Sequence, residues 1–253
     1  MKITVINGSP KGKDGNTSIM VNAFLKGAQS SGAETINIFL AEKEINHCRA
    51  CHTCWFGTPG QCVIQDDMAE ILSLGQGTDI LVLATPLKYA NISSMLKVFI
   101  ERMIVLCNPY FAQDPMGNRH PKKTAAAEAK SSFYRSKLVM IASGALATRD
   151  HFQVISSWVK KLAFYNHTEV IDEIYAPQGN LLSTPEVALR PIIENYLQLL
   201  ETAGKEIVTK NKLAEETKKL LEQNFIPDDI YIKQVNNFFD SLLTKIEHPY
   251  LKV

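Results

Sequence analysis

Short apolar runs alternate with amphipathic stretches along most of this 253-residue chain. Five runs, rich in β-branched and aliphatic residues and bounded by turn formers, predict strands at residues 2–6, 35–39, 79–84, 138–142 and 168–175. The stretches between them have apolar residues at helical spacing and predict helices that begin near Asn16 and Asp66 and that span about 92–106 and 151–165. This alternation predicts an α/β protein with an open, doubly wound, five-stranded parallel sheet and helices on both faces.

Two regions depart from the alternation. Residues 108–136 are polar and contain three prolines, so we interpret them as a long insertion. Beyond Pro177 the pattern becomes helical, and we divide the chain into a domain of residues 1–177 and a C-terminal helical extension of residues 178–253. In the extension, one apolar stripe runs at clean helical spacing from Ile232 to Ile246. It suits a contact between copies of the chain, and packing on its own domain explains it equally well.

Composition narrows the class of protein. The chain is 45% hydrophobic and 21% charged with a formal net charge of +1, as is typical of a soluble globular protein without whole-chain affinity for nucleic acid or an acidic membrane. The N-terminus turns polar too early for a secretory signal, and no apolar run approaches the roughly 18 residues of a membrane span. We expect a cytoplasmic protein.

Four of the five cysteines lie within residues 48–62. Cys48, Cys51 and Cys54 have C-x2-C-x2-C spacing, and seven residues separate Cys54 from Cys62. The bacterial ferredoxin run has the same two-residue spacings, so a 4Fe–4S cluster held by these four thiolates is the leading interpretation. Structural zinc usually takes two separated C-x2-C pairs, and a disulfide is unusual in the cytoplasm. A segment that binds no metal is the remaining alternative.

A loop that suits a phosphate follows the first predicted strand. Gly8–Thr17 precedes a helix, whose N-terminal N–H groups and dipole favour an anion, and Ser9, Thr17 and Ser18 add hydroxyls. The loop has neither the GxGxxG fingerprint nor the Walker motif. This absence weakens the case for a nucleoside triphosphatase. An ordinary glycine-rich turn with a helix cap is the alternative.

Two more loops bear on this interpretation. Thr85–Ser93 follows the third strand and Ser143–Ala145 follows the fourth. Ligands of such sheets bind beyond the carboxyl ends of the strands. Three suitable loops at that edge predict a mononucleotide with a flat ring.

The sequence resembles the NADPH-dependent FMN reductase family of flavodoxin-like proteins, and within it the iron–sulfur flavoproteins. The matching motifs are Asn7-Gly-Ser-Pro10 with Gly15-Asn-Thr17, the cysteines running into Asp66-Asp67-Met68, Thr85-Pro86, and Leu96-Lys97 to Glu101-Arg102. The resemblance implies a flavodoxin-like strand order of 2-1-3-4-5 and a tightly bound FMN.

The resemblance also implies which residues contact FMN. Those expected around the phosphate are Ser9, Lys11, Asn16, Thr17 and Ser18. Those expected around the ring are Pro86, Leu87, Lys88, Tyr89, Ala90, Asn91, Ser143, Gly144 and Ala145. Pro10 and Thr85 complete the residues expected to bind FMN. The family commonly has an aromatic residue where this chain has Lys88, with Tyr89 one position further on. A lysine there can stabilise a reduced, anionic ring, and a loop shifted by one residue is the alternative.

The sequence therefore predicts an FMN-dependent electron-transfer oxidoreductase in which the flavin, rather than a side chain, performs the chemistry. A cluster would let FMN exchange single electrons with a carrier such as ferredoxin. Without a cluster, the same fold would reduce a quinone, a free flavin or another small acceptor with NAD(P)H. A non-enzymatic flavin-binding or metal-binding module is a further alternative. We expect a homodimer or homotetramer.

Overall fold

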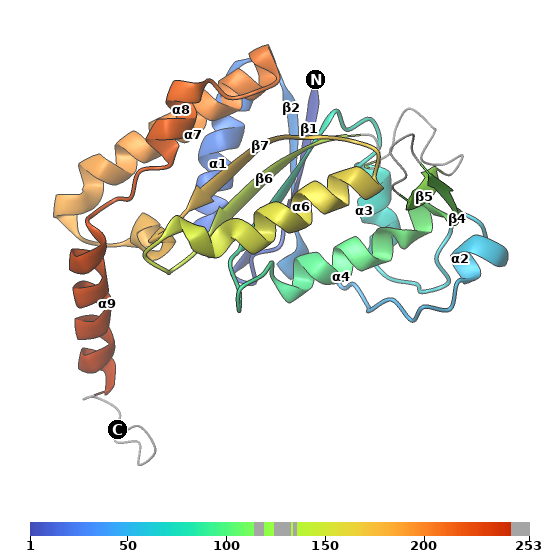
Figure 1. Cartoon of the computed structure of the whole chain (residues 1–253), viewed down its shortest axis with the longest axis horizontal. Helices are drawn as coiled ribbons and strands as arrows, with labels where there is room; N and C mark the ends of the chain where they lie inside the picture. The colour runs from blue at the N-terminus through green and yellow to red at the C-terminus, as the bar shows by residue number, and fades with distance from the viewer. Residues whose placement is uncertain (114–118, 124–132, 134–135, 244–253) are drawn as a thin grey trace.

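A five-stranded parallel sheet forms the centre of the protein in the computed structural model, which describes residues 1–113, 119–123, 133 and 136–243 (Figure 1). The strands are β1 (Lys2–Asn7), β2 (Glu34–Phe39), β3 (Ile80–Pro86), β6 (Lys137–Ser143) and β7 (Val170–Ala176). Their order is β2-β1-β3-β6-β7, with every neighbouring pair parallel. The predicted five strands and their 2-1-3-4-5 order are confirmed.

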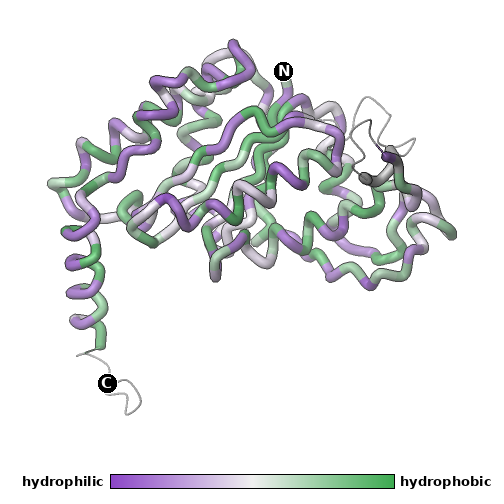
Figure 2. Tube along the Cα trace, in the orientation of Figure 1, coloured by the Kyte–Doolittle hydropathy of each residue, from purple (hydrophilic) through white to green (hydrophobic). Residues whose placement is uncertain are grey.

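Alternate side chains of β1, β3, β6 and β7 enter two separate hydrophobic cores. On β3, Ile80 and Val82 belong to one core, whereas Leu81 and Leu83 belong to the other. This strand is buried from Ile80 to Thr85, as the continuous apolar run predicts for a strand covered on both faces. In Figure 2 the central strands accordingly form the most hydrophobic part of the trace.

Helices cover both faces of the sheet. The first core is closed by α1 (Asn16–Ser30) and α7 (Arg190–Lys210), which supply Phe24 and Leu200 among others. The second is closed by α3 (Met68–Leu74), α4 (Ser94–Arg102) and α6 (Gln153–Tyr165). Short 3-10 turns connect the elements at Gly12–Asp14, Leu40–Glu42, Met103–Leu106, Arg149–Phe152, Gly179–Ser183 and Val187–Leu189.

The first helix of the C-terminal extension is in direct backbone contact with the N-terminal domain. A Cβ added at Gly27 of α1 would lie 1.8 Å from the carbonyl oxygen of Glu201, and one added at Gly204 of α7 would lie 1.9 Å from that of Phe24. Only glycine lets two helices approach so closely. Helix α7 therefore belongs to the same hydrophobic core as α1 and the sheet.

The last helix has a different environment. After α8 (Glu215–Leu221), helix α9 (Asp228–Leu243) leaves the body of the molecule (Figure 1). Tyr231, in its first turn, is 2% exposed, whereas Phe238 and Phe239 are 58% and 54% exposed. The apolar stripe of α9 therefore does not pack on its own domain over most of its length; its predicted last residue, Ile246, lies outside the described residues.

Three local predictions need correction. The helix expected at 92–106 is α-helical only to Arg102 and continues as a 3-10 turn. The expected loop at the cysteines contains one helical turn, α2 (Thr53–Phe56). The insertion contributes an antiparallel pair of strands, β4 (Cys107–Gln113) and β5 (Arg119–Lys123), and its remaining residues lie largely outside the described part of the chain. Hydropathy and length rule out a membrane-crossing helix among the described residues.

Candidate functional site

The loops after β1, β3, β6 and β7 surround a cavity of about 260 Å³ at the carboxyl edge of the sheet. It is lined by Ser9, Pro10, Lys11, Gly15, Asn16, Thr17, Pro86, Leu87, Lys88, Ser143, Gly144, Ala145, Gly179 and Asn180. Parallel strands bring these loops together because all their carboxyl ends lie at one edge. The three loops selected from the sequence thus meet at a single cavity.

The loop after β1 is held in shape by its own hydrogen bonds. Asn7 Oδ1 accepts from the Ser9 N–H at 3.1 Å, and Asn7 Nδ2 donates to Ser18 Oγ at 3.0 Å. Ser18 Oγ in turn donates to the Gly12 carbonyl at 2.5 Å. Gly12 has a φ of 53°, in the left-handed region where glycine carries no Cβ penalty.

Helix α1 begins in this loop without a side-chain cap. Gly15 occupies the N-cap position, and no side chain accepts from the N–H groups of the first turn. An uncapped helix N-terminus beside a cavity favours an anion, because unpaired N–H groups and the positive end of the helix dipole face the ligand. The geometry therefore suits a phosphate at this end of the cavity.

Hydrogen bonds join the separate loops to one another. Thr17 Oγ1 lies 2.8 Å from Ser143 Oγ, and the Leu87 N–H donates to the Ser143 carbonyl at 2.7 Å. The Gly179 N–H donates to the Gly144 carbonyl at 2.6 Å. Ser143 thus contacts both the loop after β1 and the loop after β3, so the two ends of the cavity are held at a set separation.

A strained turn lies beside the cavity. Reciprocal backbone hydrogen bonds of 2.8 and 2.9 Å join Lys88 and Asn91, and the two residues between them have positive φ, 45° at Tyr89 and 62° at Ala90. This is a type I′ turn, which normally takes Asn-Gly. The Tyr89 side chain, at the tip of this turn, is fully exposed to solvent. Backbone strain of this kind is commonly found at functional sites.

We expect the Ala90→Gly variant to be more stable than the wild type by about 0.5–1 kcal/mol. Glycine removes a left-handed penalty of about 1–2 kcal/mol and loses part of that gain to the greater entropy of its unfolded chain. Denaturant unfolding followed by circular dichroism measures the difference. A lower stability than the wild type would contradict the strained turn.

Five of the residues expected around FMN are not in the lining of the cavity. Ser18 points back to its own loop, and Thr85 Oγ1 is buried and accepts from the Ser93 N–H at 2.9 Å. Tyr89, Ala90 and Asn91 form the far side of the turn, so only Pro86, Leu87 and Lys88 of that loop line the cavity.

Sequence reasoning missed three lining residues, Gly15, Gly179 and Asn180. Gly15 lies in the loop after β1, next to residues that were expected to contact the phosphate. The other two follow β7, and Pro177 and Gly179 at the end of that strand are the same turn signal that identified the other loops. A Cβ at Gly179 would lie 3.0 Å from Ser143 Cβ, so glycine allows this fourth loop to approach the third.

The C-terminal extension supports the fourth loop. The Tyr231 hydroxyl, in the first turn of α9, lies 2.5 Å from both the Ala145 carbonyl and Asn180 Oδ1. The buried Gln178 side chain accepts from the Ile226 N–H at 3.1 Å and donates to the Ile226 carbonyl at 2.9 Å. Helix α9 therefore begins at the rim of the cavity.

The four clustered cysteines line a second, small cavity. Cys48, Cys51, Cys54 and Cys62 surround it together with Arg49, Arg102 and neighbouring loop residues. Ala50 and His52, on either side of Cys51, both have left-handed backbone conformations with φ of 50° and 54°. Burial raises the pKa of the Cys54 thiol, and the three neighbouring thiols raise it further. The fold thus brings all four thiols together.

The ends of the cysteine segment meet at a buried ion pair. Arg102 Nη1 donates to Asp66 Oδ2 at 2.6 Å and Nη2 donates to Oδ1 at 3.0 Å, and the side chains are 1% and 2% exposed. Nη1 also donates to the Asn46 carbonyl at 2.8 Å. Burial alone would raise the pKa of the Asp66 carboxyl, but hydrogen bonds from Arg102 and two backbone N–H groups hold it at about 2. The pair joins the residues before Cys48 and after Cys62.

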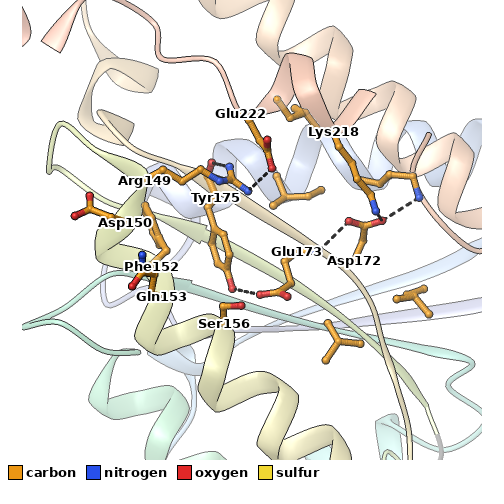
Figure 3. Close-up of a pocket in the computed structure, with 15 residues that line it drawn as sticks. Arg149, Asp150, Phe152, Gln153, Ser156, Asp172, Glu173, Tyr175, Lys218 and Glu222 are labelled. Atoms are coloured by element: carbon orange, nitrogen blue, oxygen red, sulfur yellow. Dashed lines mark hydrogen bonds and ion pairs between the residues drawn. The ribbon is translucent and has the colours of Figure 1, made fainter. Parts of the chain in front are cut away.

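A larger cavity, of about 630 Å³, lies between α6, β7 and α8 (Figure 3). Its charged side chains pair with one another: Arg149 with Glu222 at 3.1 Å and Lys218 with Asp172 at 3.3 Å. The Tyr175 hydroxyl donates to Glu173 at 2.6 Å. This cavity runs along the edge strand β7, and its charged side chains already have partners, so it is the weaker ligand site.

Comparisons with known proteins agree with this geometry. Iron–sulfur flavoproteins of Archaeoglobus fulgidus and Methanosarcina thermophila are 41% and 36% identical over 104 and 112 residues, or 41% and 44% of this chain. These alignments cover 46% and 57% of the relatives, so the chain spans about half the length of the curated relatives it matches.

Two solved structures share the fold. An FMN-dependent NADH-azoreductase from Bacillus anthracis, in complex with FMN, has a TM-score of 0.58 at 17% identity over 82% of this chain and 99% of its own. An NAD(P)H:quinone oxidoreductase from Methanothermobacter marburgensis has a TM-score of 0.55 at 14% identity over 82% of this chain and 96% of its own. Residues 1–180 match the family described as NADPH-dependent FMN reductase, and the chain belongs to that family.

Proposed function

We propose that this protein is an FMN-dependent electron-transfer oxidoreductase of the iron–sulfur flavoprotein type. The observation that supports it most is the single cavity at the carboxyl edge of the sheet, with an uncapped helix N-terminus at one end. Ser9, Asn16 and Thr17 would hold the phosphate, and the turn at Pro86–Lys88 and the small residues Ser143–Ala145 would hold the ring. Bound FMN would supply both one-electron and two-electron chemistry.

The four cysteines support a 4Fe–4S cluster as the second redox group. Within the described residues, no three His, Cys, Asp or Glu side chains are grouped closely enough to hold a single metal ion, although the four thiols share one cavity. The C-x2-C-x2-C spacing with a more distant fourth cysteine suits a cuboidal cluster better than zinc, which usually takes two separated C-x2-C pairs. The cluster would pass single electrons between FMN and a protein carrier such as ferredoxin.

Anaerobic purification tests this proposal. We expect a yellow-brown protein that retains FMN and about four iron atoms per chain. A yellow, iron-free protein that cannot be reconstituted with iron and sulfide would leave an NAD(P)H-dependent flavin or quinone reductase. A colourless protein that does not take up FMN would contradict both. Turnover of NADPH with a quinone would distinguish an enzyme from a non-enzymatic flavin-binding module.

The exposed stripe of α9 supports assembly into a homodimer or homotetramer. Its exposed apolar side chains are Ile232, Phe238, Phe239, Leu242 and Leu243. An unpartnered apolar helix face in water is usually covered by another chain. The first turn of α9 contacts the rim of the cavity through Tyr231, and most of these exposed side chains lie farther along the helix.

We expect Phe238→Asp to lower the oligomeric state, because a carboxylate buried in an apolar contact is strongly disfavoured. Asn237→Asp is the matched control, since it adds the same charge on the polar side of the same helix. Sedimentation velocity measures the masses. If the two variants sediment like the wild type, α9 does not mediate assembly.

A further inference from the structure

The Nε–H group of the buried Arg102 side chain has no acceptor among the described residues. A guanidinium has five N–H groups. Nη1 and Nη2 donate to Asp66 and to the Asn46 carbonyl, whereas Nε is buried and has no hydrogen-bond partner among the residues that the structure describes. A buried donor without an acceptor destabilises the folded protein. An acceptor that arrives with a ligand would remove this cost.

The Cys62 sulfur is placed to become that acceptor. Cys62 and Arg102 both line the small cavity of the four thiols and also a cavity of about 540 Å³ beside α3. The Cys62 side chain is also among those that interact directly with the Arg102 guanidinium. A neutral thiol is a weak acceptor. A metal-ligating thiolate carries negative charge and accepts more strongly.

We propose that Arg102 is a positioning residue for the fourth cluster ligand. Asp66 holds the guanidinium so that Nε–H donates to the sulfur of Cys62 when that sulfur is a thiolate ligand of the cluster. This inference depends on the cluster of the proposed function. The bidentate geometry matters because it fixes the guanidinium plane, and Nε–H and the second Nη2 N–H are then the donors left for another acceptor.

The expected consequence is a higher reduction potential. Hydrogen bonds to the ligand sulfurs are one of the factors that set the potential of an iron–sulfur cluster. When dithionite reduces the cluster by one electron, its negative charge increases by one and the sulfurs become better acceptors. A donor at Cys62 therefore stabilises the reduced form more than the oxidised form. Dithionite is oxidised in the same step, and no protein bond breaks.

The test compares Arg102→Lys with Arg49→Lys in the cluster-loaded, full-length protein. Both changes keep the positive charge and remove a guanidinium that lines the same small cavity, but Arg49 is exposed and Arg102 is buried. At the potential that half-reduces the wild type, we expect the ratio of reduced to oxidised cluster to fall about tenfold in Arg102→Lys, or about 59 mV for one electron. Arg49→Lys should change the ratio far less. Equal potentials for iron-loaded Arg102→Lys and wild type would overturn the proposal.

A second measurement does not depend on the folding of Arg102→Lys. Wild type and Arg49→Lys are labelled with ¹⁵N at arginine Nε, and the reduced cluster is studied by pulsed electron paramagnetic resonance. We expect a coupled ¹⁵N in both proteins. Its absence from iron-loaded Arg49→Lys overturns the role of Arg102 and leaves the cluster intact. Wild type that takes up no iron overturns the cluster as well, so the two failures are distinguishable.

Discussion

The Gly204→Ala variant is expected to be less stable than the wild type by about 3 kcal/mol, although alanine is the better helix former. Intrinsic propensity alone would favour alanine by about 1 kcal/mol within α7. The added Cβ, however, would lie 1.9 Å from the Phe24 carbonyl oxygen and 2.8 Å from the Ala28 backbone nitrogen. Both are backbone atoms of α1 and cannot rotate away, so the helices must separate. Overpacking of this kind costs about 1–3 kcal/mol and occasionally more.

Denaturant unfolding followed by circular dichroism measures the effect on Gly204→Ala. Lys205→Ala is the matched control, because Lys205 is the next residue of the same helix and is exposed. We expect the control to remain within about 0.5 kcal/mol of the wild type. A Gly204→Ala protein as stable as the control would show that α7 does not contact α1 through its backbone.

The Gly15→Ala variant is expected to bind FMN about 10-fold to 100-fold more weakly while its affinity for riboflavin stays unchanged. Gly15 has an ordinary φ of −81°, so alanine brings no backbone strain. Its Cβ would lie 2.2 Å from Ser9 Oγ, and the hydroxyl must therefore leave its place beside the cavity. A lost hydrogen bond to a charged group corresponds to about 1.5–3 kcal/mol, and every 1.4 kcal/mol is a tenfold change.

Riboflavin is the informative control for Gly15→Ala because it lacks the phosphate and keeps the ring. Quenching of flavin fluorescence on titration gives both affinities, and Asn22→Ala, at an exposed position of α1, controls for nonspecific effects. Equal losses for both flavins would indicate collapse of the cavity. Unchanged FMN affinity would place the phosphate away from Ser9.

Much of the fold followed from local pattern. The strands were predictable because β3 and β6 are buried along nearly their whole length and therefore read as continuous apolar runs. The carboxyl-edge loops were predictable because glycine and proline mark the points at which strands end. Helix ends were less certain: α4 gives way to a 3-10 turn at Arg102, which apolar spacing does not reveal.

The candidate site was predictable in part. Ser9, Thr17, Pro86 and Ser143 line the cavity, because each lies at or near the end of a strand or the start of a helix. The direction of the chain within a loop was not predictable. Reciprocal hydrogen bonds turn Tyr89 and Ala90 away from the cavity, and those bonds depend on backbone angles that neither residue favours.

The sequence by itself determined the alternating α/β architecture, the three loops that suit a flavin and the grouping of four cysteines, because each depends on residues close together in the chain. The tertiary structure decided the features that join distant residues. It packed Gly204 against Phe24, brought Gly179 and Asn180 to the cavity, and paired Asp66 with Arg102. These depend on the close approach of separate elements, and neither hydropathy nor spacing along one segment encodes such an approach.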